Sequence, residues 1–275
     1  MHNDFRLPPT GFGPGSQHQD ETLEYMPMPQ DMRTYSPHIP DAEAASDREA
    51  IDLLRRMAEA ASDVADTAGS RTFDLSQLPN HSRSLIAEVL GEGEVSIRMR
   101  GIPAIAAQES VFAGIWVLKG EGIDLVEVAP IPRLAKERAF SPQRSALGQA
   151  APDISGLANA PALIVELLDK SAGFEPGRPA HVINLTLLPH TEPDLEWLSN
   201  ALGEGSVTVL SRGYGNCRIE ATATPGVWRV QFFNSMDALI LDTFEVTEMP
   251  EVAIAAAEDL IDSASRIEAV LEAIQ

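Results

Sequence analysis

LGEGEVSIRMRG occupies residues 90–101, and LGEGSVTVLSRG occupies residues 202–213, 112 positions later. The two stretches share Leu-Gly-Glu-Gly, an alternating run with β-branched residues, and Arg-Gly. Self-similarity at a fixed separation is the signature of a repeated structural unit. We therefore expect a fold built from two related halves.

Sparser matches extend this repeat in both directions. They pair Leu78-Pro79 with Leu188-Pro189 at a separation of 110, Gly114-Ile-Trp116 with Gly226-Val-Trp228 at 112, and Glu127-Val128 with Glu245-Val246 at 118. The increase in separation predicts a longer hairpin in the second half.

Each half has the pattern of a helix that ends at Gly-Glu-Gly, followed by four alternating strands and another helix. The expected strands are 95–100, 105–113, 115–119 and 123–129 in the first half, and 206–212, 216–223, 227–234 and 238–247 in the second. The predicted fold class is α+β, with an antiparallel sheet-plus-helix unit used twice.

Composition divides the chain into five expected segments. They are a disordered arm rich in Pro and Gly at 1–45, an amphipathic helix at 46–70, the first α+β unit at 71–140, a connector with a short helix at 141–180, and the second unit at 181–275.

Two helices have clear end signals. Ser46 and Glu49 form a capping box for the helix at 46–70, and Gly69 supplies a stop. A long amphipathic helix is expected from Pro250 to Ile274, because proline is tolerated in a first helical turn and apolar residues follow on one face.

The formal net charge is −21, which argues against binding to a phosphate backbone. Residues 1–70 carry 13 acids against 5 bases, and residues 181–275 carry 15 against 4, so the two ends hold most of the excess. Such a field solvates the surface and can steer a basic partner. The single cysteine and the lack of a long apolar run predict a cytoplasmic protein without membrane insertion.

The two halves act as controls for each other. Features that both halves keep, such as the glycines and tryptophans, are most simply explained by the fold. Where the second half has Tyr214-Gly-Asn-Cys-Arg218, the first has Ile102-Pro-Ala-Ile-Ala106. This difference makes the second half the candidate for a contact surface.

An aromatic ring, amides and guanidinium groups set among glycines are typical of recognition surfaces. The expected partner-binding residues are Tyr214, Asn216, Cys217, Arg218, Asn234 and Arg212, although Arg100 matches the last of these in the first half. A structural turn held by Asn216 is an equally good interpretation.

Cys217 has three possible roles besides a contact. It could be a nucleophile or redox-sensing thiol assisted by His181 or His190, a single ligand of an iron–sulfur cluster at a subunit interface, or a small buried apolar residue. No paired-cysteine or paired-histidine metal motif, Walker loop or dinucleotide fingerprint occurs in the sequence. We therefore expect no catalytic residue, metal or cofactor.

The string SRGYGNCRI at 211–219, with VWRVQFFNS at 227–235 and LILDT at 239–243, closely resembles the C-terminal region of the HupH/HyaF/HoxQ family of hydrogenase expression and formation proteins. The resemblance is strongest over 181–275 and looser over 71–140.

This resemblance implies an accessory chaperone without catalytic activity in the maturation of a membrane-bound uptake [NiFe] hydrogenase. The implied partners are the precursor of the iron–sulfur small subunit, with its twin-arginine export signal, and a thioredoxin-like companion of the HyaE/HoxO type. The alternative from the residues alone is a thiol-dependent enzyme or redox-sensing protein that uses Cys217.

Overall fold

A computed structural model of the chain describes residues 47–152, 154–212 and 216–274. The expected arm at 1–45, Ser46 and Tyr214 lie outside these described residues.

Two sets of elements follow each other in the same order: helix, short strand, helix and four strands. The first set is α1 (Arg48–Thr67), β1 (Arg71–Asp74), α2 (Asn80–Leu90), β2 (Val95–Met99), β3 (Ile105–Glu109), β4 (Ile115–Gly120) and β5 (Ile123–Val128). The second set is α4 (Ala160–Ala172), β6 (His181–Asn184), α5 (Glu192–Leu202), β7 (Val207–Ser211), β8 (Asn216–Ala221), β9 (Val227–Phe233) and β10 (Leu239–Val246). The short helix α3 (Arg133–Arg138) follows the first set, and the 3-10 turn η4 (Glu251–Ala253) and the long helix α6 (Ala257–Ile274) follow the second.

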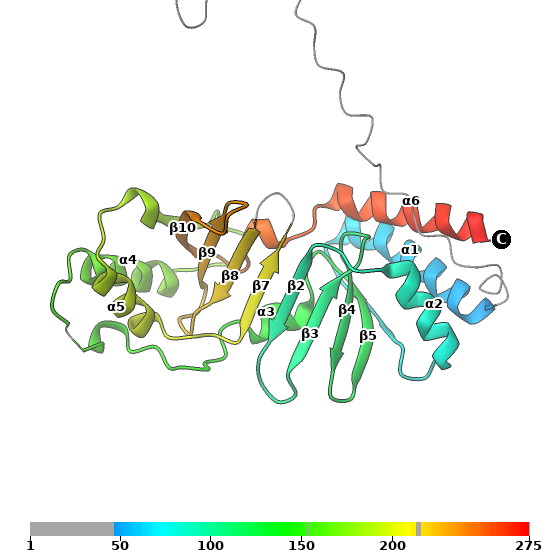
Figure 1. Ribbon diagram of the computed structural model, residues 1–275, viewed down its shortest axis with the longest axis horizontal. Coiled ribbons are helices and arrows are strands. Elements are labelled where there is room, and N and C mark those ends of the chain that lie inside the picture. The colour runs from blue at the N-terminus through cyan, green and yellow to red at the C-terminus, as the bar shows by residue number, and fades with distance from the viewer. Residues whose placement is uncertain (1–46, 153, 213–215, 275) are drawn as a thin grey trace, which may run out of the picture. The chain divides into compact units, whose positions relative to one another are not determined.

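The strands form a 10-stranded antiparallel sheet in the order β1-β5-β4-β3-β2-β7-β8-β9-β10-β6. Counterpart strands occupy mirrored places in this order. At the centre, β2 pairs with β7, and Ile97 lies opposite Val209 (Figure 1). These two positions correspond in the repeat, so the register places an approximate two-fold axis between the halves. The expected α+β class is confirmed, while a common origin of the halves stays a prediction.

The eight expected strands are all present, with ends that differ by a few residues from the predicted ones. The structure adds β1 and β6, which pair with β5 and β10 at the two ends of the sheet. Helices α1 and α4 occupy corresponding places, so the helix expected at 46–70 and the short helix of the connector are counterparts.

Two predicted helix ends are corrected. The N-cap of α1 is Asp47, whose side chain accepts a hydrogen bond from the backbone N–H of Ala50 at 3.1 Å, and Ala68 rather than Gly69 takes the left-handed position at its end. Pro250 precedes the turn η4, and α6 begins seven residues later at Ala257.

The shared tryptophans have equivalent structural roles. Trp116 Nε1 donates to the Ala129 carbonyl at 3.0 Å, and Trp228 Nε1 donates to the Thr247 carbonyl at 3.1 Å. Both rings are fully buried. The expectation that they belong to the scaffold is confirmed.

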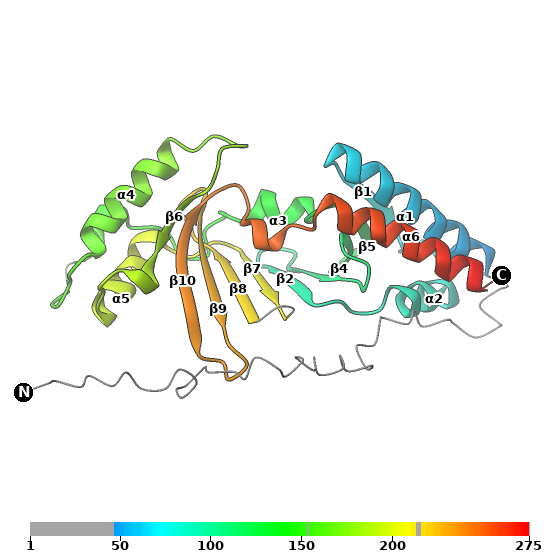
Figure 2. The same cartoon turned by 90° about the horizontal axis from the view of Figure 1, so that it is seen from above.

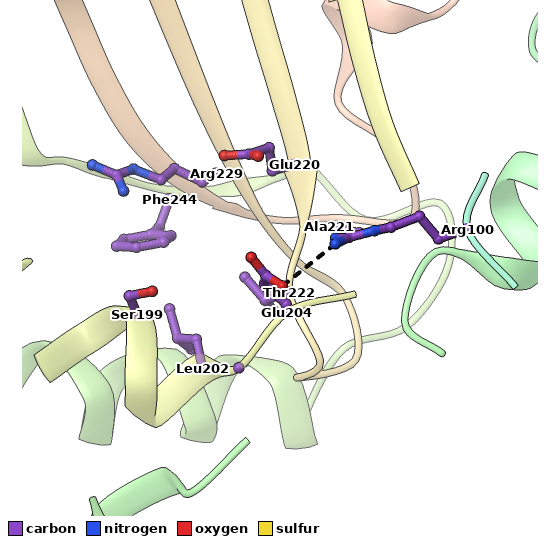
Figure 3. Close-up of a pocket in the computed structure, with 10 residues that line it drawn as sticks. Arg100, Ser199, Leu202, Glu204, Glu220, Ala221, Thr222, Arg229 and Phe244 are labelled. Atoms are coloured by element: carbon purple, nitrogen blue, oxygen red, sulfur yellow. Dashed lines mark hydrogen bonds and ion pairs between the residues drawn. The ribbon is translucent and has the colours of Figure 1, made fainter. Parts of the chain in front are cut away.

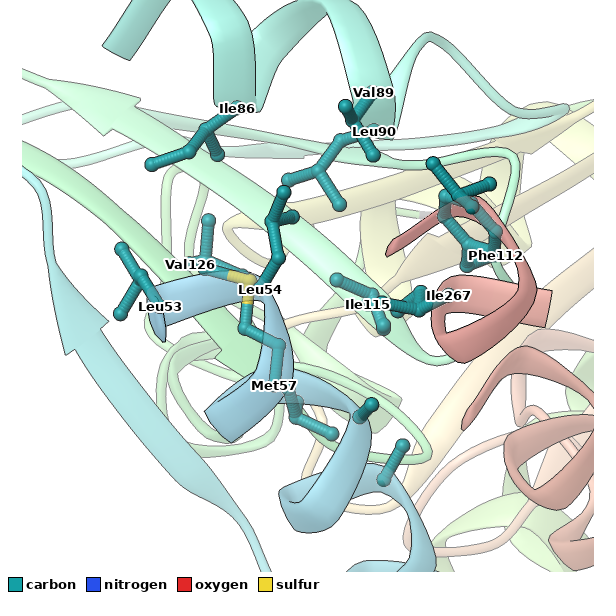
Figure 4. Close-up of a cluster of buried hydrophobic side chains, with 14 of the residues drawn as sticks. Leu53, Leu54, Met57, Ile86, Val89, Leu90, Phe112, Ile115, Val126 and Ile267 are labelled. Atoms are coloured by element: carbon teal, nitrogen blue, oxygen red, sulfur yellow. The ribbon is translucent and has the colours of Figure 1, made fainter. Parts of the chain in front are cut away.

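Three apolar cores support the sheet. One lies under α1, α2 and α6 in the first half, one lies under α4 and α5 in the second, and one fills the opposite face beneath α3 and η4. Helix α6 comes from the end of the chain and lies alongside α1, where Ile267 packs near Phe112 and Ile115 (Figures 2 and 4). The C-terminal helix therefore completes the core of the first half.

Candidate functional site

The four central strands, β3, β2, β7 and β8, bury one face of the sheet and leave the other face accessible. Along β8, for example, Cys217, Ile219 and Ala221 are buried, whereas Asn216 and Arg218 are exposed. This alternation follows from the two-residue period of a strand. We call the accessible face the open sheet face; its residues are Ser96, Arg98, Ala106, Gln108, Thr208, Leu210, Arg212, Asn216, Arg218 and Glu220.

The register arranges these side chains in rows that cross both halves. One row runs Lys119, Ala106, Arg98, Thr208, Glu220, Arg229 from β4 to β9, and the next runs Val117, Gln108, Ser96, Leu210, Arg218, Gln231. Neighbours in a row are close enough to act together on one ligand. A protein partner laid across the face would meet cationic, amide and apolar side chains in sequence.

Cations on the open sheet face, and Lys119 beside it on β4, differ in their pairing. Arg218 Nη2 lies 2.5 Å from Glu220 Oε1. Among the ion pairs of the described residues, none includes Arg98 or Lys119. Guanidinium and ammonium groups without an internal partner remain available to carboxylates or carbonyls of another chain.

A groove of about 430 Å³ opens on the first-half part of this face, beside α2. Gly91, Ala87, Ala106 and Val117 give it apolar walls, and Arg98 and Lys119 also line it. A groove of this size accommodates a few side chains of a partner.

A smaller pocket of about 80 Å³ lies near the end of α5 (Figure 3). Arg229 donates to Asp242 through two hydrogen bonds, of 3.0 and 2.6 Å, and its guanidinium lies 5.9 Å from the ring of Phe244. Arg100 contacts Glu204 at 3.4 Å and the Gly205 carbonyl at 2.8 Å. Since the charged groups are paired within the chain and the space fits only a few waters, this pocket is structural.

Three of the expected contact residues lie on the open sheet face: Arg212, Asn216 and Arg218. Asn216 Nδ2 donates to Asp237 Oδ1 at 3.1 Å, which ties β8 to the β9–β10 turn. Asn216 therefore has a structural role in addition to its exposed position, as the alternative interpretation proposed.

The structure places Cys217 and Asn234 elsewhere. Cys217 points to the covered face and is 4% exposed, so its thiol does not reach a partner docked on the folded protein. Asn234 Oδ1 accepts from the backbone N–H groups of Met236 and Ala238 at 2.9 and 3.0 Å, so it holds the hairpin turn. Burial argues against a direct contact by Cys217, and Asn234 has a structural role in addition to its predicted contact.

Thiol chemistry at Cys217 is disfavoured. Burial, with a smaller contribution from the charge of Glu245, raises the pKa of Cys217 to about 11, whereas a nucleophilic cysteine needs a low pKa. His181 lies in β6, which two strands separate from β8 in the sheet, and His190 Nδ1 contacts the Leu188 carbonyl. Neither histidine is placed to act as its base.

The described residues contain no group of three or more His, Cys, Asp or Glu side chains arranged to hold a metal ion. No helix in the described ranges combines the length and hydropathy needed to cross a bilayer.

Sequence reasoning missed Arg98, Lys119 and Leu210. The first half was taken as scaffold, and the pairing between β2 and β7, which continues the face across both halves, joins positions 112 residues apart. The alternation of exposed residues in β2 was the available signal.

Comparisons with known proteins agree with the resemblance seen in the sequence. The family model "HupH hydrogenase expression protein, C-terminal conserved region" matches residues 48–141 and 157–274. Hydrogenase expression/formation protein HupH of Rhodobacter capsulatus is 58% identical over 100% of both chains. HoxQ of Cupriavidus necator is 42% identical over 98% of both, and hydrogenase-1 operon protein HyaF of Escherichia coli K12 is 32% identical over 94% of both.

Proposed function

This chain belongs to the HupH family of hydrogenase expression and formation proteins, and from that premise we propose that it is a cytoplasmic chaperone of the hydrogenase small subunit. In this proposal it holds the iron–sulfur small-subunit precursor of a membrane-bound uptake [NiFe] hydrogenase before export. It acts by binding and not by catalysis.

The open sheet face is the observation that supports this proposal. Four strands from both halves present the exposed Arg98 and Arg218 and the partly exposed Leu210 on one continuous surface. A chaperone needs a surface that offers polar and apolar contacts without a reaction centre, because it must hold and then release a protein. Arg212 and Asn216 extend this contact area, and Tyr214, outside the described residues, stays a proposed member.

Two further partners belong to the proposal. One is the twin-arginine signal of the precursor, whose positive charge suits a chain with a formal net charge of −21. The other is a thioredoxin-like companion of the HyaE/HoxO type. A companion of this type would supply redox chemistry for which the buried Cys217 is poorly placed.

Charge reversal on the open sheet face tests the proposal. Arg98→Glu and Arg218→Glu, alone and together, are expressed with the hydrogenase operon and used to capture small-subunit precursor. Reversing a charge inside an interface costs enough to weaken binding about 10-fold or more. We therefore expect both variants to recover much less precursor and to lower hydrogenase maturation.

Arg55→Glu is the matched control, because Arg55 is exposed on α1 away from this face and makes a similar surface ion pair. It should capture precursor normally. Equal capture by Arg218→Glu and Arg55→Glu would remove the open sheet face from the proposal. Recovery of the large subunit in place of the small subunit would overturn the chosen client.

A further inference from the structure

A second concave surface lies beside β6, on the opposite face of the sheet. It holds about 610 Å³ and has apolar walls made by Val182, Phe232, Met249, Val252 and Ile254. Val182 is 51% exposed and Val252 45%, so apolar side chains here face solvent. Phe232 also packs against the core that contains Cys217, which places the groove on the face covered elsewhere by α3 and η4.

Glu245 lies in this groove without a cationic partner among the described residues. Its carboxylate accepts one hydrogen bond, from the Thr243 hydroxyl at 3.3 Å. The other charged groups at the groove are Arg178, which pairs with Glu175 at 2.6 Å, and Glu251. Burial first, and then the charge of Glu251, raises the pKa of Glu245. A cation bound here would favour the charged carboxylate and so offset both effects.

The corresponding residue of the first half shows how this carboxylate is hydrogen-bonded when a helix covers it. Glu127 is 3% exposed, and its Oε1 accepts the backbone N–H of Arg133, the first residue of α3, at 2.9 Å. In the second half, the three-residue turn η4 replaces α3, and the chain then leaves toward the first half, where Ala255 N–H donates to the Pro130 carbonyl. The groove therefore marks the place where the second half lacks a covering helix.

The groove also adjoins a sheet edge. In the described part of the chain, β6 is the last strand after β10, so its outer backbone groups have no neighbouring strand. An extended peptide can add to such an edge through main-chain hydrogen bonds, and every second side chain then points to one face. Val182 places an exposed apolar side chain of β6 in the lining of the groove.

We propose that this groove binds an extended segment of a protein partner in which apolar residues alternate and one arginine or lysine meets Glu245. The apolar side chains lie against Val182, Val252 and Ile254, and the cation lies against the carboxylate. The inference deepens the proposed function by describing the kind of client segment that the second half holds, and it rests on that function only in taking the partner to be a protein.

Fluorescence anisotropy with the full purified chain tests the groove directly. The probe is a labelled peptide in which valine alternates with serine and one central valine is replaced by arginine; the reference peptide carries neutral citrulline at that position. Since a hydrogen bond to a charged group strengthens binding by about 10-fold or more, the arginine peptide should bind at least that much more tightly. Glu245→Gln should remove this difference, and Ile254→Ser should weaken both peptides.

Glu59→Gln is the control, because it removes the same charge from the exposed side of α1. It should keep the preference for arginine. Equal affinity of the two peptides for the unaltered chain, or a preference that survives Glu245→Gln, would overturn the proposal. So would concentration-dependent dimers that Ile254→Ser abolishes, because a second copy would then fill the groove. None of these readouts uses hydrogenase, so failure here is distinct from failure of the small-subunit capture.

Discussion

Cys217 lies on the covered face of β8, between neighbours whose side chains point to solvent. A buried thiol with a pKa raised to about 11 is almost entirely protonated at neutral pH. We predict that iodoacetamide labels Cys217 very slowly in the native protein and rapidly in guanidinium chloride, as followed by intact mass. Cys217→Ala should keep hydrogenase maturation. Fast labelling of the native chain, or loss of maturation in a folded Cys217→Ala protein, would restore the thiol alternative.

Glu109 has a buried carboxylate that accepts a hydrogen bond from one backbone N–H. It accepts the backbone N–H of Gly114 at 3.0 Å, while burial raises its pKa from 4.5 to about 7. Between these values the folded state holds more protons than the unfolded state, so the free energy of unfolding falls as pH rises through this window. Stability from the protonated form is complete below the unfolded pKa and is lost above the folded one.

Glu109→Gln keeps an oxygen for Gly114 and cannot ionise. We expect little difference from the unaltered protein at about pH 4.5 and a gain of about 2 kcal/mol at about pH 8, measured by urea unfolding across pH. Glu121→Gln, in the exposed β4–β5 turn, should show no such trend. A pH-independent difference for Glu109→Gln would mean that the native carboxyl titrates normally.

Asp194 joins the starts of two helices in the second half. Its Oδ1 accepts the backbone N–H groups of Ala158, Asn159 and Ala160 at the start of α4, and its Oδ2 accepts that of Thr191 at the start of α5. Burial opposes ionisation, but these donors prevail and bring the pKa to about 2. A carboxylate at two helix N-termini also interacts favourably with the positive ends of both helix dipoles.

Asp194→Asn should therefore destabilise the protein by about 2–4 kcal/mol near neutral pH, because an amide nitrogen would face the donor N–H of Thr191. Because the folded pKa is depressed, the lost stabilisation is present above the unfolded value near 3.8 and disappears as pH falls through about 2. Thermal unfolding measures it, and Glu192→Gln in the same first turn is the control. Equal melting temperatures for both variants would contradict this role.

The elements that sequence reasoning recovered are those with a strong local pattern. Apolar and polar residues alternate clearly in strands β2 to β5 and β7 to β10, and the corresponding strand of the other half supported each prediction. Strands β1 and β6 were missed because each has four residues, and three of the four in β1 are exposed. Their strand conformation depends on pairing with β5 and β10, which no local pattern encodes.

The candidate site was recovered in part for a related reason. Arg218 was found because its counterpart is Ala106, whereas Arg98 lay in a half that was taken as scaffold. Glu245 was missed because Glu127 matches it, although the two carboxylates have different surroundings. Comparison of the halves identifies residue types that differ, but it cannot identify equal residues whose environments differ.

At the scale of the whole molecule, the two halves are joined by more than a connector. The β2–β7 pairing makes one sheet of both, and α6 brings Leu260 and Ile267 from the end of the chain into the first-half core. Ser263 Oγ also donates to the Ala113 carbonyl at 2.9 Å. The open sheet face crosses this junction, so its geometry depends on both halves being folded.

The charge of the whole chain should act on the rate of client binding more than on its lifetime. The acidic residues Glu258, Asp262, Glu268 and Glu272 lie exposed on α6, and the second half carries much of the net charge of −21. Long-range attraction of a basic precursor raises the association rate and is screened by salt.

Replacing these four acidic residues of α6 by their amides should lower the association rate several-fold and leave the dissociation rate nearly unchanged in surface plasmon resonance. The difference from the unaltered chain should vanish at about 1 M salt, where the Debye length is about 3 Å. If the variant with all four substitutions binds with unaltered rates at low salt, the acidic field does not steer the client. Short-range contacts on the open sheet face alone would then account for recognition.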